Sequence, residues 1–136
     1  MLLMRRQNRN KFKFGHISLW LMLNASEDSD LCNSKNFLEP WRQMDNPSFY
    51  ENELKKEITF FNPLFWKKVR AVGIRTDCDD VLFEVLNWKR KYAVVHLTYS
   101  RERSRKFPTV TFYKDWKDFY KNRLVIDYKD WKEDKD

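Results

Sequence analysis

The sequence predicts an α+β fold: a small antiparallel sheet of about four strands, in meander order, with helices packed on one face. Two observations predict it. Residues 76–86 and 92–99 are rich in β-branched, aromatic and aliphatic side chains, and the five-residue connection 87–91 between them is typical of a β-hairpin. The segments on either side of this hairpin combine capping residues with apolar side chains at helical spacing. A chain of 136 residues is expected to form one domain.

The helix before the hairpin is expected over residues 47–58. Asn46 is a suitable N-cap residue for it. Tyr50, Leu54 and Ile58 recur every four residues, which places them on one face. This segment is therefore predicted to be an amphipathic helix.

Three more elements complete the predicted order. Residues 65–76 are expected to form a strand before the hairpin, and residues 109–113 a short strand after it. Asp115 can cap a second helix. The apolar side chains of that helix, at helical spacing, are Trp116, Phe119, Tyr120 and Leu124.

The chain is predicted to consist of an N-terminal tail (1–36), a single domain (37–128) and a charged C-terminal tail (129–136). In the first segment, basic residues precede the short apolar run 17–23, an outline that is also found in secretory signals. A disordered tail or an upstream start codon is the favoured interpretation, because the run is far shorter than the ~20 residues of a membrane span. We accordingly expect a cytoplasmic protein, with export as the alternative.

Composition excludes several classes of function. The chain has only two glycines, whereas a phosphate-binding loop or a dinucleotide fingerprint needs several for close backbone approach. It has two cysteines and two histidines, too few for a typical structural zinc site. One pair of cysteines is no disulfide framework for this length, which suits a reducing compartment. No cofactor is expected.

Two motifs carry a resemblance to a known family. Residues 77–83 read Asp-Cys-Asp-Asp-Val-Leu-Phe, and residues 94–100 read Val-Val-His-Leu-Thr-Tyr-Ser. Together with Pro108 and the aromatic helix after it, they resemble an uncharacterised family of small bacterial proteins with a DDVLF…VVHLTW-like core. Tyr99 stands where that family usually has Trp. The resemblance covers about residues 38–128 and implies one compact bacterial domain, but it brings no known activity, cofactor or catalytic residue.

One face of the hairpin is the best candidate for a binding site. If Leu86 faces Tyr92, then Asp80 and Glu84 both lie diagonal to His96, about 7–8 Å away between backbones. A carboxylate beside a histidine favours the imidazolium and can form an acid–base pair. The candidate face comprises Asp80, Glu84, Tyr92, His96 and Thr98. An ordinary polar sheet face is the favoured alternative, and no catalytic residue is assigned.

Two other chemistries are considered and set aside. Asp77, Asp79 and Asp80 are suited to a hard cation such as Mg²⁺, but no acidic cluster elsewhere completes a ligand set, so no metal is expected. Cys78 and His96 are suited to a nucleophile and its base, but the assumed register separates them by about 13 Å.

Basic residues form two candidate patches at opposite ends of the strand 92–99. They are Lys89, Arg90 and Lys91 at one end, and Arg101, Arg103, Arg105 and Lys106 at the other. A strand of about eight residues separates them by ~26 Å, so they do not form one stripe for a nucleic-acid backbone. Solvated loops are the favoured interpretation.

The expected function is that of a non-enzymatic protein-binding module, either regulatory or immunity-like, with an unidentified protein partner. Small size and a wealth of aromatic and Arg residues, the types that dominate interface energetics, support it. The first alternative is a nucleic-acid-associated protein, based on the net charge of +7, although specific binding is not expected. The second is a hydrolase that uses Asp80, Glu84 and His96.

Overall fold

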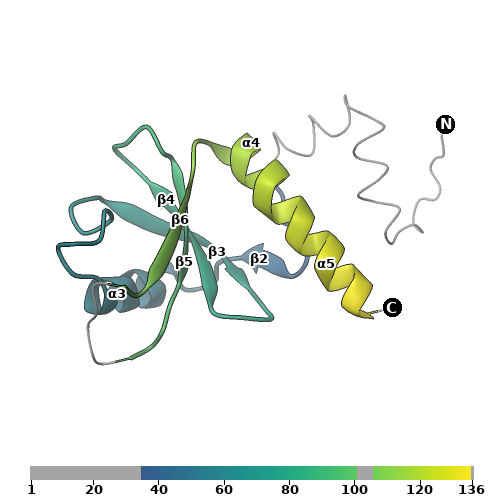
Figure 1. Cartoon of the computed structure of the whole chain (residues 1–136), viewed down its shortest axis with the longest axis horizontal. Helices are drawn as coiled ribbons and strands as arrows, with labels where there is room; N and C mark the ends of the chain where they lie inside the picture. Colours follow the sequence, from purple (N-terminus) through teal and green to yellow (C-terminus); the bar gives the residue numbers. More distant parts are fainter. Residues whose placement is uncertain (1–34, 101–105, 136) are drawn as a thin grey trace.

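A computed structural model describes residues 35–100 and 106–135 of the chain. In chain order the elements are β2 (Trp41–Gln43), α3 (Pro47–Glu57), β3 (Val69–Arg75), β4 (Asp80–Val85), β5 (Tyr92–His96), β6 (Thr109–Tyr113), α4 (Trp116–Phe119), the π-helical turn η1 (Tyr120–Leu124) and α5 (Val125–Lys135). Within the described residues one sheet has five strands in the order β2-β3-β4-β5-β6, and all neighbours are antiparallel. The predicted α+β class and meander order are confirmed, with one strand more than expected (Figure 1).

The helices lie on both faces of the sheet, and the expectation that they share one face is wrong. Helix α3 covers one face, and the continuous helix α4–η1–α5 lies against the other (Figure 1). Val81 and Phe83 are buried under α3, whereas Leu82 and Val94 are buried under the C-terminal helices. Strands with apolar residues on both sides need a cover on both sides, as in buried sheets.

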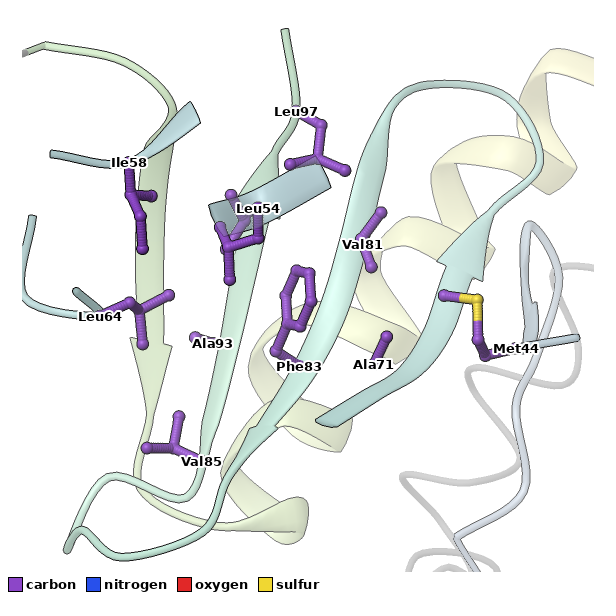
Figure 2. Close-up of a cluster of buried hydrophobic side chains, with 11 residues drawn as sticks. Met44, Leu54, Ile58, Leu64, Ala71, Val81, Phe83, Val85, Ala93 and Leu97 are labelled. Carbon is purple, nitrogen blue, oxygen red and sulfur yellow. The ribbon is translucent and has the colours of Figure 1, made fainter. Parts of the chain in front are cut away.

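The core under α3 matches the predicted amphipathic helix. The Asn46 side chain accepts a hydrogen bond from the Phe49 N–H, and Pro47 occupies the first helical position. Leu54 and Ile58 are buried among aliphatic side chains of the sheet (Figure 2). Packing of this face, more than intrinsic helix propensity, accounts for the stability of an eleven-residue helix.

The second core is aromatic. The Asp115 side chain accepts a hydrogen bond from the Asp118 N–H and caps α4, as predicted. Behind the cap, Trp116 and Phe119 are buried, and the Phe119 ring meets the Trp41 ring edge-to-face at 5.3 Å. Such edge-to-face pairs add stability beyond the area that they bury.

The C-terminal segment of the chain is helical. Helix α5 continues to Lys135, through residues 129–135 where a charged tail was expected. Trp131 stabilises this last part, because its ring packs beside that of Tyr128 and under the ammonium group of Lys135. The segment 1–34, with its signal-like apolar run, lies outside the described residues.

The sheet begins with a strand that was not predicted. This strand, β2 (residues 41–43), pairs with residues 73–75 of β3. Strand β3 starts at Val69, later than predicted, because residues 60–67 form turns instead of a strand. A bulge at Val72 places Ala71 and Gly73 opposite consecutive residues of β4. A Cβ atom on Gly73 would lie 2.6 Å from Cζ of Phe37, so the close approach of this ring requires glycine.

None of the helices in residues 35–100 and 106–135 has the length and apolar character needed to cross a membrane.

Candidate functional site

The hairpin register divides the predicted candidate face into two separate parts. The expected pairing of Leu86 with Tyr92 is wrong: Glu84 lies opposite Tyr92, and Asp80 lies opposite His96. The two-residue shift leaves each side chain on its expected face, because the period of a strand is two. It arises because the turn is longer, with the Val85 N–H bonded to the Lys91 carbonyl.

Asp80 and His96 meet, as the sequence predicted, but Glu84 is not beside them. The His96 Nδ1 atom lies 2.7 Å from Oδ1 of Asp80. The second oxygen of Asp80 accepts a hydrogen bond from Arg123 on η1. The Asp80 side chain is buried, whereas half of the His96 side chain is exposed. Glu84 binds Arg70 instead.

These contacts belong to a larger network, named here the charge cluster. It consists of Arg75, Asp77, Asp80, His96, Arg123 and Asp127. Asp127 accepts hydrogen bonds from Nε of Arg123 and from Nε1 of Trp41, both at 2.8 Å. The cluster therefore links the C-terminal helices to β3, β4 and β5, and through Trp41 to β2.

The electrostatics of the cluster favour the charged forms of Arg123 and Asp77. Burial lowers the pKa of Arg123, but hydrogen bonds to Tyr113 and the Asp127 carboxylate outweigh it and raise the pKa above its usual range. Two hydrogen bonds of 2.8 Å from Arg75 hold the pKa of Asp77 below its ordinary value. Sequence reasoning missed Arg75, Arg123 and Asp127 because nothing in the local pattern tells which charged side chains of a strand or helix turn inward.

What the cluster can do chemically follows from these pairings. Each oxygen of Asp80 already has a side-chain partner and the carboxylate is buried, which disfavours its use as a base on a ligand. Buried carboxylates paired with guanidinium groups are costly to break, and they hold packed elements in one arrangement. We interpret the cluster as a structural lock between helix and sheet.

Glu84 and Tyr92, the other part of the predicted face, line a hollow named here the groove. Its volume is about 780 Å³. Its lining residues are Lys35, Asn36, Phe37, Trp41, Arg42, Gln43, Arg70, Val72, Glu84, Tyr92 and Trp116. The groove thus lies on the face opposite α3, between the outermost strand β2 and the start of α4.

Thr98 takes part in neither feature, because it binds a buried carboxylate at the end of α3. Glu57 accepts hydrogen bonds of 2.7 Å from the N–H groups of Thr98 and Tyr99, and one of 2.9 Å from the Thr98 hydroxyl. Desolvation raises the pKa of Glu57, but a hydrogen bond from Glu53 and those from Thr98 and Tyr99 together lower it below its usual value. The backbone of Tyr99 turns with a positive φ of 56°, and Glu57 holds this strained exit from β5 in place.

The described residues of the two basic patches lie at the expected ends of β5. Lys89, Arg90 and Lys91 are exposed in the β4–β5 turn, where the Arg90 guanidinium lies over the Trp88 ring. Lys106 is exposed near the start of β6, and Arg101, Arg103 and Arg105 lie outside the described residues. The sequence did not reveal that Lys67 and Lys68 join the first patch: the Lys67 ammonium also lies over the Trp88 ring, at 4.7 Å.

The remaining candidates are separated or engaged. In the described part of the chain no group of three or more His, Cys, Asp and Glu side chains is placed to hold a metal ion. The Cys78 thiol is partly buried, and this burial raises its pKa, which disfavours the thiolate that a nucleophile needs.

Comparison of the chain with protein-family models, with curated proteins and with solved structures gave no match.

Proposed function

We propose that the chain is a non-enzymatic module that binds a protein partner, and that an extended acidic segment of this partner lies in the groove. The observation that carries the proposal is the composition of the groove, with aromatic walls and an excess of cations. Trp, Tyr and Arg are the side chains that contribute most to protein interfaces.

The walls of the groove are preorganised. Phe37 and Tyr92 both contact the Trp116 ring, at 5.5 and 5.7 Å between centroids. Trp41 is held by its hydrogen bond to Asp127 and by the Phe119 ring. Rigid aromatic walls lose little conformational entropy when a partner binds, which favours affinity.

The charge of the groove favours an acidic segment. Lys35, Arg42 and Arg70 contribute three cations to the lining, and its single acid, Glu84, is paired with Arg70. Arg42 also pairs with Asp45 beside the groove, so the lining keeps an excess of two positive charges and the immediate surroundings an excess of one. More than half of the Arg42 and Arg70 side chains is exposed. Their positive potential steers an acidic partner and rejects a basic one.

The groove also reaches the edge of the sheet. Within the described residues β2 is an outermost strand, paired with β3 alone. An extended peptide can approach such an edge and place alternate side chains in the neighbouring hollow. This geometry supports a regulator or an immunity-like protein, and the free thiol of Cys78 suits the cytoplasm of a bacterium.

A photo-crosslinking experiment tests the proposal. The full chain, with a photo-reactive residue in place of Gln43, is exposed to nuclease-treated native lysate at physiological and at 0.5 M salt. We expect one protein to be crosslinked. Replacing both Arg42 and Arg70 by glutamine is expected to lower the yield at least tenfold.

The matched control removes two cations from the C-terminal helices instead, at the exposed residues Lys117 and Lys129. This control is expected to keep the crosslink. Equal losses in both double variants, or the absence of a crosslinked protein, would contradict the proposal. A crosslink that forms in a parallel sample of untreated lysate, but not in the nuclease-treated lysate, would favour the alternative of a nucleic-acid-associated protein.

A further inference from the structure

Two connections leave the same end of the sheet and form a surface separate from the groove. They are residues 58–68, between α3 and β3, and residues 86–91, between β4 and β5, named here the basic aromatic end (Figure 1). The Leu86 N–H donates a hydrogen bond of 2.9 Å to the Lys68 carbonyl, which fixes the two connections side by side. None of their residues lines the groove.

Large apolar side chains are exposed on this end. Their exposed fractions are 76% for Trp66, 63% for Phe60, 50% for Phe61, 47% for Leu86 and 38% for Phe65. Between Phe60 and Trp66 the only buried apolar side chain is Leu64, which anchors the connection in the core under α3 (Figure 2). A cluster of exposed aromatic residues of this size indicates contact with an apolar phase or with a partner.

The backbone of the longer connection satisfies its own polar groups. The N–H groups of Asn62, Phe65 and Lys67 donate to carbonyl groups three residues earlier, at 2.9 to 3.0 Å. The Leu64 N–H donates to the Asn62 side chain, also at 2.9 Å. These N–H groups can therefore leave water without losing a hydrogen bond, a condition for entry into a lipid interface.

The charge of the surface has one sign. The two connections hold five cations, at Lys67, Lys68, Lys89, Arg90 and Lys91, and no Asp or Glu. The acids nearest in the chain are engaged elsewhere. Glu57 is bonded to Thr98 and Tyr99, and Glu84 to Arg70.

We infer that the basic aromatic end docks the protein on an anionic lipid surface, with Phe60 and Trp66 entering the headgroup region and the cations facing anionic headgroups. Aromatic side chains partition to membrane interfaces, and clusters of Lys and Arg bind anionic leaflets. One anchor of each kind is weak, but together they give stable, reversible attachment, as two signals do in lipidated proteins.

The shape of the surface favours a lipid over a macromolecular partner. The aromatic side chains are exposed on a series of turns and do not line the groove. They also pack in pairs, Phe60 stacked on Phe61 at 4.2 Å and Phe65 edge-to-face with Trp66 at 4.7 Å. Single-stranded nucleic acid needs separate aromatic platforms between which bases stack, and these paired rings do not provide them.

Co-flotation of the full chain with vesicles tests the inference. The vesicles contain phosphatidylcholine alone, or phosphatidylcholine with 30% phosphatidylserine. We expect at least tenfold stronger binding to the anionic vesicles, weakened at 0.5 M salt. The double variant Phe60→Ser/Trp66→Ser and the double variant Lys89→Glu/Lys91→Glu are each expected to bind at least tenfold more weakly.

Matched controls change exposed side chains of the same kinds elsewhere. Phe107→Ser/Ile126→Ser removes two exposed apolar side chains, and Lys117→Glu/Lys129→Glu reverses two exposed cations. Both are expected to bind within twofold of the unchanged chain, and all variants to keep its thermal midpoint. Equal binding to both vesicle types, or equal losses in the controls, would overturn the inference.

Two further outcomes would also overturn it. Loss of binding in the charge variant alone would show mere adsorption, without entry of Phe60 and Trp66. Binding to poly-glutamate or to a single-stranded oligonucleotide, with none to vesicles, would assign the surface to an acidic macromolecule.

Discussion

Replacing Glu57 removes the single acceptor that holds the exit of β5 against the end of α3. The carboxylate accepts three hydrogen bonds from Thr98 and Tyr99, and its side chain is buried. Alanine leaves all three donors without this acceptor, whereas glutamine keeps one oxygen. The two substitutions therefore form a graded pair.

The expected magnitude follows from the exposure of the donors. A donor that loses its acceptor in a buried place costs about 1–3 kcal/mol. Thr98 and Tyr99 are themselves exposed, so water can replace part of each lost bond. We therefore take the lower end of that range for each donor and expect Glu57→Ala to lower the free energy of unfolding by about 3 kcal/mol, and Glu57→Gln by about half of this.

The pH dependence supplies an independent check, because the pKa of Glu57 is lowered on folding from a reference value of 4.5. A lowered pKa means that the charged form stabilises the fold above the reference value. This contribution is lost as the pH falls through the folded pKa. In urea unfolding at pH 7 and at lower pH, the difference between the unchanged chain and Glu57→Gln should shrink below pH 4.5.

Glu53 provides the matched control, one helical turn away. Its pKa is raised, first by the hydrogen bond with Glu57 and then by partial burial. Its contribution is therefore present below pH 4.5 and lost as the pH rises through the folded pKa. Glu53→Gln should not destabilise the protein at pH 7. A loss below about 0.5 kcal/mol in Glu57→Ala, or a Glu57→Gln effect that is equal at every pH, would refute the role of this carboxylate.

Three further predictions use urea unfolding at pH 7. Asp80→Ala should lower the free energy of unfolding by about 3–5 kcal/mol, because it leaves Arg123 without its Asp80 partner. His96→Ala should lower it by less than about 1 kcal/mol, because half of the His96 side chain is exposed. Equal losses in the two variants would contradict the structural lock. Gly73→Ala should cost about 1–3 kcal/mol through its clash with Phe37, and Phe37→Leu in the same chain should recover part of it; additive losses would place Phe37 elsewhere. Trp41→Phe should cost about 1–3 kcal/mol through the lost hydrogen bond to Asp127, and a neutral result would show that water replaces this bond.

Local chemistry made most of the fold predictable. The cap at Asn46 and the spacing of Leu54 and Ile58 predicted α3, and the cap at Asp115 predicted the start of the C-terminal helix. Short connections made the meander the default strand order. These features depend on residues close in sequence, which is why a single sequence was sufficient for them.

Features set by distant contacts were not predictable. Strand β2 has three residues and exists because its partner, β3, lies alongside it. The hairpin register depended on the length of a turn, and that length decided whether Leu82, as expected, or Asp80, as observed, lay opposite His96. The Arg123 partner of Asp80 in the charge cluster lies on η1, 43 residues along the chain, so only the folded arrangement brings the two side chains together.

At the basic aromatic end, the β-propensity of the sequence predicted a strand where the chain forms turns. Phe65 and Trp66 have high β-propensity, and this extended the predicted strand back to residue 65. The Asn62 side chain accepts a hydrogen bond from the Leu64 N–H and sustains a series of turns instead. A buried strand would have hidden these rings in the core. Because the segment turns instead, only Leu64 points inward, and the aromatic side chains are left exposed beside Lys67 and Lys68. The difference between strand and turn therefore decides whether these residues are core or contact surface, and the vesicle experiment tests the second.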